Sequence, residues 1–116
     1  MANTDKLLKK ILAFREARDW KQFHNPKDLA ISLSLEASEV LEHFQWKSKE
    51  GALEKYIGTH KKEIGEEIAD VLYWVILLAH DLDIDVEKAF EKKMRKNEKK
   101  YPVKKSKGRD TKYNKL

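Results

Sequence analysis

The amino-acid sequence predicts an all-α protein, a four-helix-bundle type of fold followed by a basic tail. Apolar residues recur nearly throughout at the three- and four-residue spacing of amphipathic helices. No stretch alternates apolar and polar residues in the way a half-buried strand would. The chain of 116 residues contains four glycines and two prolines, which are too few for a turn-rich β fold. The length allows one domain with a modest core.

The first two helices are predicted in the N-terminal half. Thr4 and Asp5 are candidate caps for the first helix. Its apolar row consists of Leu7, Leu8, Ile11, Leu12 and Phe14. Asn25-Pro26 is a favourable helix start, because asparagine caps free N–H groups and proline lacks one that would need capping. We therefore expect the second helix to run from about Pro26 to Trp46.

The other two helices are predicted after Gly51. A long third segment begins there and continues to about Leu82, with Gly58 as a candidate break. The polar turn "DLDID" (81–85) caps a fourth helix from about Val86 to Lys100. Tyr101-Pro102 ends this helix, because proline disfavours helical backbone at the preceding residue.

Charge and composition narrow the function classes. The net charge of +5 belongs to residues 104–116, which contain six Lys or Arg and one acid, so the remaining chain balances 19 basic with 19 acidic residues. A nucleic-acid-binding domain would carry its basic stripe on the fold itself. We therefore expect no specific nucleic-acid partner, although a non-catalytic helical module that binds nucleic acid through its tail is the alternative.

The sequence also lacks the features of secreted, membrane-spanning and P-loop proteins, and we expect a cytoplasmic protein. The chain has no cysteine, which excludes disulfides and cysteine zinc sites. The longest apolar run, "VLYWVILLA" (71–79), is too short to span a bilayer, and the N-terminal segment does not resemble a secretory signal. A glycine-rich phosphate loop is also absent, which excludes a P-loop mechanism.

Two pairs of acids interrupt or border the predicted apolar rows. Glu36 and Glu39 lie three residues apart on the second helix, and Glu67 and Asp70 lie three apart on the third, so each pair shares a helix face. Antiparallel packing of the two helices would bring the pairs together. Four carboxylates in one place repel each other unless a cation lies between them. Oxygen-only ligands predict Mg²⁺ or Mn²⁺ rather than zinc.

The competing interpretation is a purely structural oligomer whose acids are solvated surface pairs. Glutamates at this spacing are common on exposed helix faces, and 39% of the chain is charged. The metal interpretation is favoured because other acids do not fall on apolar rows. These are Glu42, Glu63 and Glu66.

Several motifs carry a resemblance to a known family. They are "ExxE" at 36–39 and "ExxD" at 67–70, with 27 residues between, "RDWKQFHNPKDL" (18–29), "FQWK" (44–47), "KKMRKNEKKYPV" (92–103) and "KGRDTKYNKL" (107–116). In order and spacing they resemble the all-α nucleoside triphosphate pyrophosphohydrolases of the MazG-like superfamily, in particular the dCTP pyrophosphatase branch. The resemblance covers roughly residues 7 to 116.

The resemblance implies an activity, a cofactor and an assembly. It implies Mg²⁺-dependent hydrolysis of a nucleoside triphosphate to monophosphate and pyrophosphate by a homodimer or homotetramer. The implied substrate is dCTP or a related or modified pyrimidine nucleotide. The sequence departs from the pattern of the dCTP-type enzymes at two positions associated with the nucleoside pocket, where Ile11 and Trp74 replace a histidine and a tyrosine.

The resemblance also assigns residue roles. Glu36, Glu39, Glu67 and Asp70 would hold the metal, and one of the four acids would also orient the attacking water. Glu39 and Glu36 are the candidate catalytic residues, with Glu39 as the candidate for orienting the water. The candidate substrate-binding residues are Trp20, Trp46, Trp74, Lys93, Asn97 and Tyr101.

The substrate-binding residues fall into two groups. Trp20 and Trp46 lie at helix ends, where an indole either stacks on a base or closes the end of the bundle; the resemblance favours base contact. Trp74 either walls off the sugar or belongs to the core. On the fourth helix, Lys93 and Asn97 share a face that Tyr101 continues, and the resemblance places the first two at the phosphates or sugar.

The expected organisation is a helical catalytic domain over residues 1–103 and a basic tail over 104–116. The tail carries two apolar residues, Tyr113 and Leu116, that a purely solvated arm would not need. We therefore expect it to pack near the active site. The four histidines show no metal-ligand spacing and are expected at the surface or in packing, with His24 near the mouth of the pocket.

Overall fold

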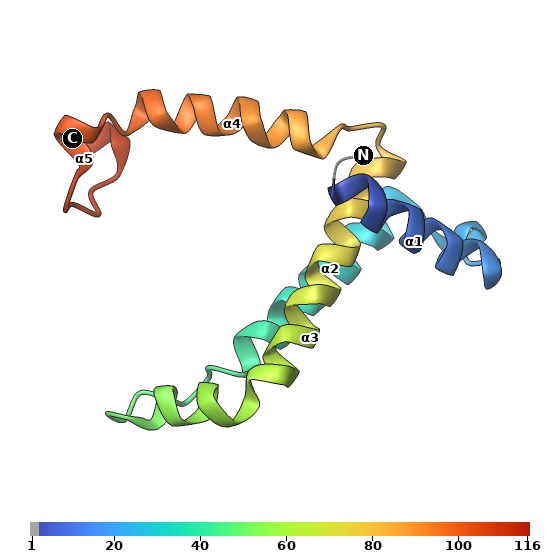
Figure 1. The fold of residues 1–116 in the computed structure, drawn as a ribbon, viewed down its shortest axis with the longest axis horizontal. Coiled ribbons are helices and arrows are strands. Elements are labelled where there is room, and N and C mark those ends of the chain that lie inside the picture. Colours follow the sequence, from blue (N-terminus) through green and yellow to red (C-terminus); the bar gives the residue numbers. More distant parts are fainter. Residues whose placement is uncertain (1–2) are drawn as a thin grey trace. The chain divides into compact units, whose positions relative to one another are not determined.

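The computed structural model describes residues 3–116, and the regular elements of this part are all helical, as predicted (Figure 1). The elements are α1 (Asn3–Ala17), the 3-10 helix η1 (Lys21–Phe23), α2 (Pro26–Glu42), α3 (Ala52–Asp81), α4 (Val86–Lys100), α5 (Val103–Ser106) and the 3-10 helix η2 (Tyr113–Lys115). They form two compact units, Met1–Asp83 and Ile84–Leu116.

The start of α2 is as predicted, whereas the start of α1 is not. The Asn25 side chain accepts a hydrogen bond from the Asp28 backbone N–H at 2.9 Å, with Pro26 in the first turn. By contrast, α1 already begins at Asn3, so Thr4 and Asp5 lie inside its first turn instead of preceding it. The acidic Asp5 still suits that position, because the first turn of a helix attracts negative charge.

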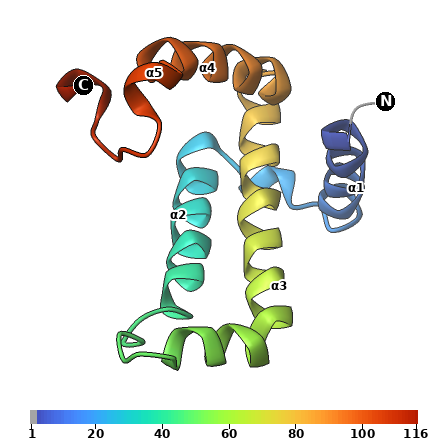
Figure 2. The same cartoon turned by 60° about the vertical axis from the view of Figure 1, so that its left-hand side comes forward.

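The connection between α2 and α3 differs from the prediction. Helix α2 ends at Glu42, four residues before Trp46, which lies in the turn with a positive φ of 66°. The break in α3 is at His60, whose φ and ψ of −120° and 19° are not helical, two residues beyond the predicted Gly58. The first two turns of α3 consequently run across the end of α2 before the helix turns to lie along it (Figure 2).

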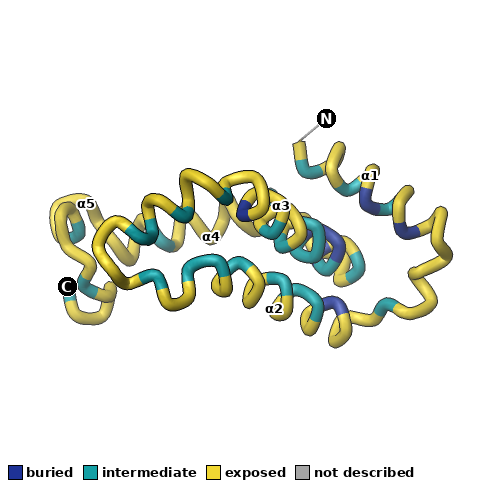
Figure 3. Tube along the Cα trace, turned by 90° about the horizontal axis from the view of Figure 1, so that it is seen from below, coloured by how far each residue is buried: buried dark blue, intermediate teal, exposed yellow. Residues whose placement is uncertain are grey.

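The core of the first unit forms where α1 and α2 both pack on α3. Helices α2 and α3 are antiparallel (Figure 2). The buried side chains at this junction are Ile11, Leu29, Ile76 and Leu77, and the dark segments of α1, α2 and α3 in Figure 3 mark buried positions. This small core fixes the relation of α2 to α3, and with it the relation of the two acidic pairs.

The second unit contains α4 and the tail. The Asp85 side chain caps α4 by accepting a hydrogen bond from the Lys88 N–H at 3.1 Å, and the helix ends at Lys100, before Tyr101-Pro102, as predicted. The Tyr113 ring meets the Tyr101 ring edge-on at 6.1 Å, and Lys100 Nζ lies 4.6 Å above the Tyr113 ring. The tail thus folds back onto the C-terminal end of α4.

Among residues 3–116, no helix combines the length and the apolar composition needed to cross a lipid bilayer.

Candidate active site

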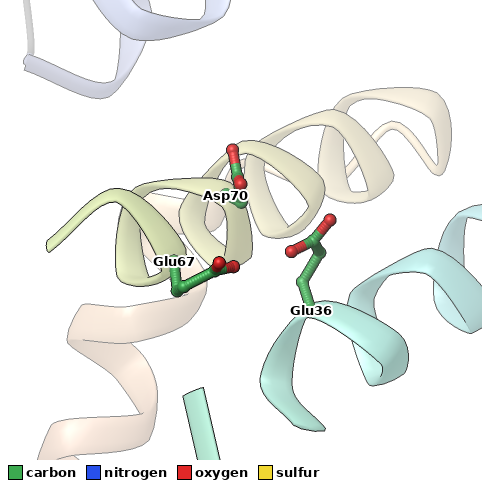
Figure 4. Close-up of side chains that lie close together, drawn as sticks. All are labelled: Glu36, Glu67 and Asp70. Carbon is green, nitrogen blue, oxygen red and sulfur yellow. The ribbon is translucent and has the colours of Figure 1, made fainter. Parts of the chain in front are cut away.

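Antiparallel packing brings acids from both predicted pairs together. Glu36 points from α2 toward Glu67 and Asp70 on α3 (Figure 4). The three side chains each offer a carboxylate oxygen within 4.8 Å of the others. Glu36 and Glu67 are half-buried, whereas Asp70 and the fourth predicted acid, Glu39, are exposed. We call the three residues Glu36, Glu67 and Asp70 the acid cluster.

The acid cluster is electrostatically strained. Glu39, close enough to share a hydrogen bond, together with burial and the neighbouring negative charges raises the pKa of Glu67 to about 7. Burial, followed by the proximity of Glu39 and the Asp70 charge, also raises the pKa of Glu36. Glu39 therefore lies within electrostatic reach of both residues, although it is not one of the three that meet within 4.8 Å.

Two oxygens of the cluster are buried without a hydrogen-bond partner in the described chain, namely Oε2 of Glu36 and Oε2 of Glu67. A buried carboxylate oxygen without a partner is costly, because it has lost its water. A divalent cation would offset both the missing partners and the mutual repulsion. Since the donors are all carboxylate oxygens, the residues present fit Mg²⁺ or Mn²⁺.

A cleft of about 440 Å³ opens on one side of the acid cluster. Because four of its eight lining residues are aromatic, we call it the aromatic cleft. It is lined by Lys10, Ile11, Phe14, Trp20, Glu36, Asp70, Tyr73 and Trp74. Phe14 meets Trp20 and Tyr73 edge-on, at ring-centre distances of 5.6 and 6.2 Å. Such a cleft can enclose a flat ring beside the acids.

A buried arginine holds the wall of the aromatic cleft. Arg15 is only 2% exposed and forms two hydrogen bonds to the Asp81 carboxylate, at 2.7 and 3.0 Å. Its backbone carbonyl accepts the Trp20 N–H at 3.2 Å. Arg15 therefore connects the turn that carries Trp20 to the far end of α3.

His24 completes this wall. Burial, followed by the Arg15 charge, holds the pKa of His24 below its usual range, which leaves its Nδ1 free to accept a hydrogen bond from Arg15 at 3.4 Å. The His24 ring meets Trp74 edge-on at 5.9 Å. The position next to a cleft-lining tryptophan agrees with the expectation that His24 lies near the pocket.

A second cleft, of about 410 Å³, opens beside the other half of the predicted acids. It is lined by Glu39, Glu42, His43, Tyr56 and Glu67, and we call it the polar cleft. The acids thus divide between the clefts: Glu36 and Asp70 face the aromatic cleft, whereas Glu39 and Glu67 face the polar one. Glu42 is exposed, as expected of a surface acid, and also lines the polar cleft.

The predicted substrate-binding residues are divided between the two units of the chain. Trp20 and Trp74 line the aromatic cleft. Trp46 is 89% exposed and lines neither of the two clefts. Three further predicted residues, Lys93, Asn97 and Tyr101, belong to α4 and its C-cap in the second unit, where Asn97 is half-buried and the other two are exposed.

Some residues that line the clefts were not predicted as site residues from the sequence. Phe14 belonged to the predicted apolar row, yet it is 42% exposed and lines the aromatic cleft. Tyr73 gave one usable signal, since it directly precedes Trp74 and lies three residues after Asp70. No sequence pattern pointed to His43 and Tyr56, because these two residues meet only through the bend in α3.

The chain is similar in sequence to a known protein family and to characterised relatives. The model of the MazG-like family matches residues 31–116. The chain is 38% identical over 104 residues to dCTP pyrophosphatase 1 of Rattus norvegicus and 34% identical over 104 residues to that of Homo sapiens. These alignments cover 89% of this chain but 61% of each relative, so the chain spans about three fifths of their length.

A solved structure is similar over nearly its whole length. The crystal structure of a pyrophosphatase from Archaeoglobus fulgidus superimposes with a TM-score of 0.82 at 39% sequence identity, covering 88% of this chain and 94% of that one. The family match, these sequence identities and the shared helical fold confirm the resemblance found in the sequence. The chain belongs to the MazG-like family.

Proposed function

We propose that this protein is a Mg²⁺-dependent pyrophosphohydrolase that cleaves a nucleoside triphosphate to monophosphate and pyrophosphate. The proposed substrate is dCTP or a related or modified pyrimidine nucleotide. The observation that carries the proposal is the acid cluster, whose carboxylates lie within 4.8 Å of one another at the edge of the aromatic cleft. The names of the relatives, dCTP pyrophosphatase 1 and pyrophosphatase, agree with it.

The acids would hold the cation. Glu36, Glu67 and Asp70 offer the converging oxygens, and Glu39 lies close enough to raise the pKa of Glu67. A bound Mg²⁺ or Mn²⁺ would supply the positive charge that offsets the triphosphate and polarises the reacting phosphate.

The aromatic cleft would hold the nucleoside. Trp20, Tyr73 and Trp74 offer flat ring faces and edges, and Ile11 adds an apolar contact. Lys10 is the cation that lines this cleft, and it can reach a base oxygen or a phosphate. With a nucleoside placed there, its α-phosphate would lie over Glu36 and Asp70, which line the same cleft.

In the proposed reaction, water attacks the α-phosphorus. The water oxygen forms a bond to phosphorus, the bond to the oxygen that bridges the α- and β-phosphorus breaks, and that oxygen leaves with the pyrophosphate. Glu39 orients the water and accepts its proton. Glu36 would help to hold the cation that offsets the charge of the reacting phosphate. Lys93 and Asn97, which the resemblance places at the phosphates or sugar, are proposed to contact them, and Tyr101, which continues the same helix face, is proposed to contact the substrate as well.

We propose a homodimer or homotetramer as the working assembly. Several apolar side chains of α2 and α3 are exposed in the single chain, including Leu35 at 62%, Leu41 at 69% and Ile68 at 54%. Apolar exposure of this extent along two neighbouring helices is typical of surfaces that pair. Trp46, 89% exposed, could then reach a site on a neighbouring copy.

The test is a screen of the common ribo- and deoxynucleoside triphosphates with Mg²⁺, in which pyrophosphate release is measured. We expect pyrophosphate and nucleoside monophosphate in equal amounts, with dCTP or another pyrimidine deoxynucleotide cleaved fastest. Orthophosphate as the only phosphate product would contradict attack at the α-phosphorus.

A matched pair of variants assigns the activity to the site. Asp70→Asn removes one acid of the cluster, whereas Glu63→Gln removes an exposed acid of the same helix. Loss of turnover in Asp70→Asn with an unchanged rate in Glu63→Gln would support the assignment. Equal rates in both variants would refute it.

A further inference from the structure

The acids that separate the two clefts suggest where each half of a substrate lies; this inference rests on the proposed function. A nucleoside triphosphate joins a flat ring system to a highly charged chain. The aromatic cleft suits the ring system, and the polar cleft, which is lined by Glu39 and Glu67 instead of Glu36 and Asp70, contains no purely apolar side chain. A substrate with its α-phosphate at the acids would therefore extend its β- and γ-phosphates into the polar cleft.

The polar cleft presents a hydrogen-bond donor to such a ligand. His43 Nδ1 is 2.6 Å from the Tyr56 hydroxyl, and within residues 3–116 no hydrogen bond involves His43 Nε2. If the phenol donates to Nδ1, the proton of the neutral imidazole must be on Nε2. If the imidazole is protonated, both nitrogens carry protons. In both of these states Nε2 donates, and binding of a phosphate oxygen requires one of them, because a neutral imidazole that donates from Nδ1 to the phenol oxygen would leave Nε2 as an acceptor.

Positive charge lies next to this donor. Lys47 Nζ is 4.1 Å from the centre of the Tyr56 ring, and its second contact is the Gln45 carbonyl at 3.3 Å. The ring of His60 stacks parallel to the Tyr56 ring, with 4.0 Å between the ring centres. Lys47 thus stands beside the hydrogen-bonded pair that lines the cleft.

The bend in α3 is what assembles this group. His60 has non-helical backbone angles, and the segment before it crosses the end of α2 (Figure 2). This brings Tyr56, from the first turns of α3, to His43 at the C-terminal cap of α2. Because α2 ends there, its last carbonyls add partial negative charge, which favours a hydrogen-bond donor at this position.

We propose that the polar cleft binds the pyrophosphate end of the substrate, and the pyrophosphate product, with His43 Nε2 donating to a phosphate oxygen and Lys47 adding charge. Glu39, Glu42 and Glu67 also line the cleft, so the free anion would be repelled. The proposed ligand is accordingly the magnesium complex of pyrophosphate, in which the cation would offset the charge of the carboxylates and a phosphate oxygen would accept from His43.

Two substitutions of His43 separate its two nitrogens. His43→Asn places an amide near the position of Nδ1, so it keeps a partner for Tyr56 and removes the donor at Nε2. His43→Gln reaches the position of Nε2 and keeps that donor. His80→Asn is the matched control, because His80 is exposed on α3 and lines neither cleft.

The measurement is calorimetric binding of magnesium pyrophosphate to the full chain, with magnesium dCMP as the second probe. We expect His43→Asn to weaken pyrophosphate binding roughly tenfold to a hundredfold, the range for a lost hydrogen bond to a charged group. His43→Gln and His80→Asn should stay within about threefold of wild type, and dCMP binding should change less than about twofold in all three. Lys47→Gln should weaken pyrophosphate binding several-fold, which provides a second test independent of the His43–Tyr56 contact.

The outcomes distinguish this inference from the proposed function. Equal pyrophosphate affinity in wild type, His43→Asn and Lys47→Gln would overturn the inference even if the enzyme cleaves dCTP. A parallel loss of dCMP and pyrophosphate binding in His43→Asn would also overturn it, because that indicates a general structural effect. Pyrophosphate binding that depends on His43, in a protein that hydrolyses no triphosphate, would support the cleft assignment and refute the proposed function.

Discussion

Arg15 and Asp81, 66 positions apart in the sequence, form a bidentate ion pair that ties α1 to the last turn of α3. Nη1 of Arg15 lies 2.7 Å from Oδ2 of Asp81, and Nη2 lies 3.0 Å from Oδ1. The Arg15 side chain is 3% exposed and that of Asp81 16%. The ion pair is therefore nearly buried, and it joins α1 to α3 next to the residues that line the aromatic cleft.

Breaking this pair should destabilise the protein. Asp81→Asn leaves a buried guanidinium without its carboxylate, which we expect to lower the free energy of unfolding by about 3 kcal/mol. Urea denaturation measures the change, with Asp83→Asn, at an exposed position, as the control. The double variant Arg15→Met with Asp81→Leu should recover part of the loss, since no charge is left buried. An unfolding midpoint of Asp81→Asn equal to that of wild type would contradict this.

The same pair predicts a pH dependence. Burial alone would raise the pKa of Asp81, but the Arg15 hydrogen bonds and charge outweigh burial and hold that pKa below its ordinary value of 3.8. For an acid with a lowered folded-state pKa, the stabilisation is complete above 3.8 and is lost as the pH falls through the folded-state value.

The stability difference between wild type and Asp81→Asn should thus persist at pH 5 and above and shrink below about pH 4. Urea titrations at a series of pH values check it. A difference that is largest at the lowest pH would show that the ion pair is not its source.

Metal removal should abolish turnover and change stability. With EDTA in excess, we expect no pyrophosphate release, because carboxylates alone cannot offset the charge of a triphosphate. Mg²⁺ at a hundred times its dissociation constant should add about 2.7 kcal/mol to the free energy of unfolding. Undiminished activity after exhaustive chelation would refute the metal assignment.

Glu67→Gln should raise the melting temperature of the metal-free protein. The raised pKa of Glu67 indicates that its charged form is disfavoured among Glu39, Glu36 and Asp70, and the amide carries no charge. The same substitution should abolish most of the stabilisation by Mg²⁺. Glu63→Gln, measured by the same thermal denaturation, should show neither effect. A lower melting temperature of metal-free Glu67→Gln would argue against repulsion in the cluster.

Glu39→Gln should keep the fold and lose activity. The amide is nearly isosteric with the carboxylate, but it can neither accept the water proton nor offer a charged oxygen. We expect turnover to fall roughly a hundredfold or more, as for the loss of one preorganised catalytic group. Steady-state kinetics and circular dichroism measure rate and fold. Wild-type rates in both Glu39→Gln and Asp70→Asn would show that the acids are not the catalytic site.

Truncation after Val103 compares the enzyme with the nucleic-acid-binding alternative. The tail folds back through Tyr113 onto Tyr101, which is a predicted substrate-binding residue. We expect its removal to raise KM for the nucleotide, with negligible DNA or RNA binding at physiological salt before and after. An unchanged KM together with the loss of salt-sensitive nucleic-acid binding would favour the binding module instead.

The sequence by itself determined the helical class, the main helix boundaries and the family. Hydrophobic spacing is a local property, and so are the caps Asn25 and Asp85, whose side chains bond to N–H groups three residues on. The two acidic pairs could also be predicted from the sequence, because residues three apart on one helix share a face. Their convergence needed only the antiparallel packing of α2 and α3.

Only the tertiary structure decided which residues surround the acids. The bend fell at His60 instead of Gly58, and this bend brings Tyr56 to His43, although neither residue stood out in the sequence. In the sequence, Arg15 does not differ from other charged helix residues, and only the structure shows that it pairs with Asp81 in the interior. Charged and aromatic side chains can be buried or exposed on the same helix. Their surroundings depend on partners distant in the sequence, and local spacing carries no information about those partners.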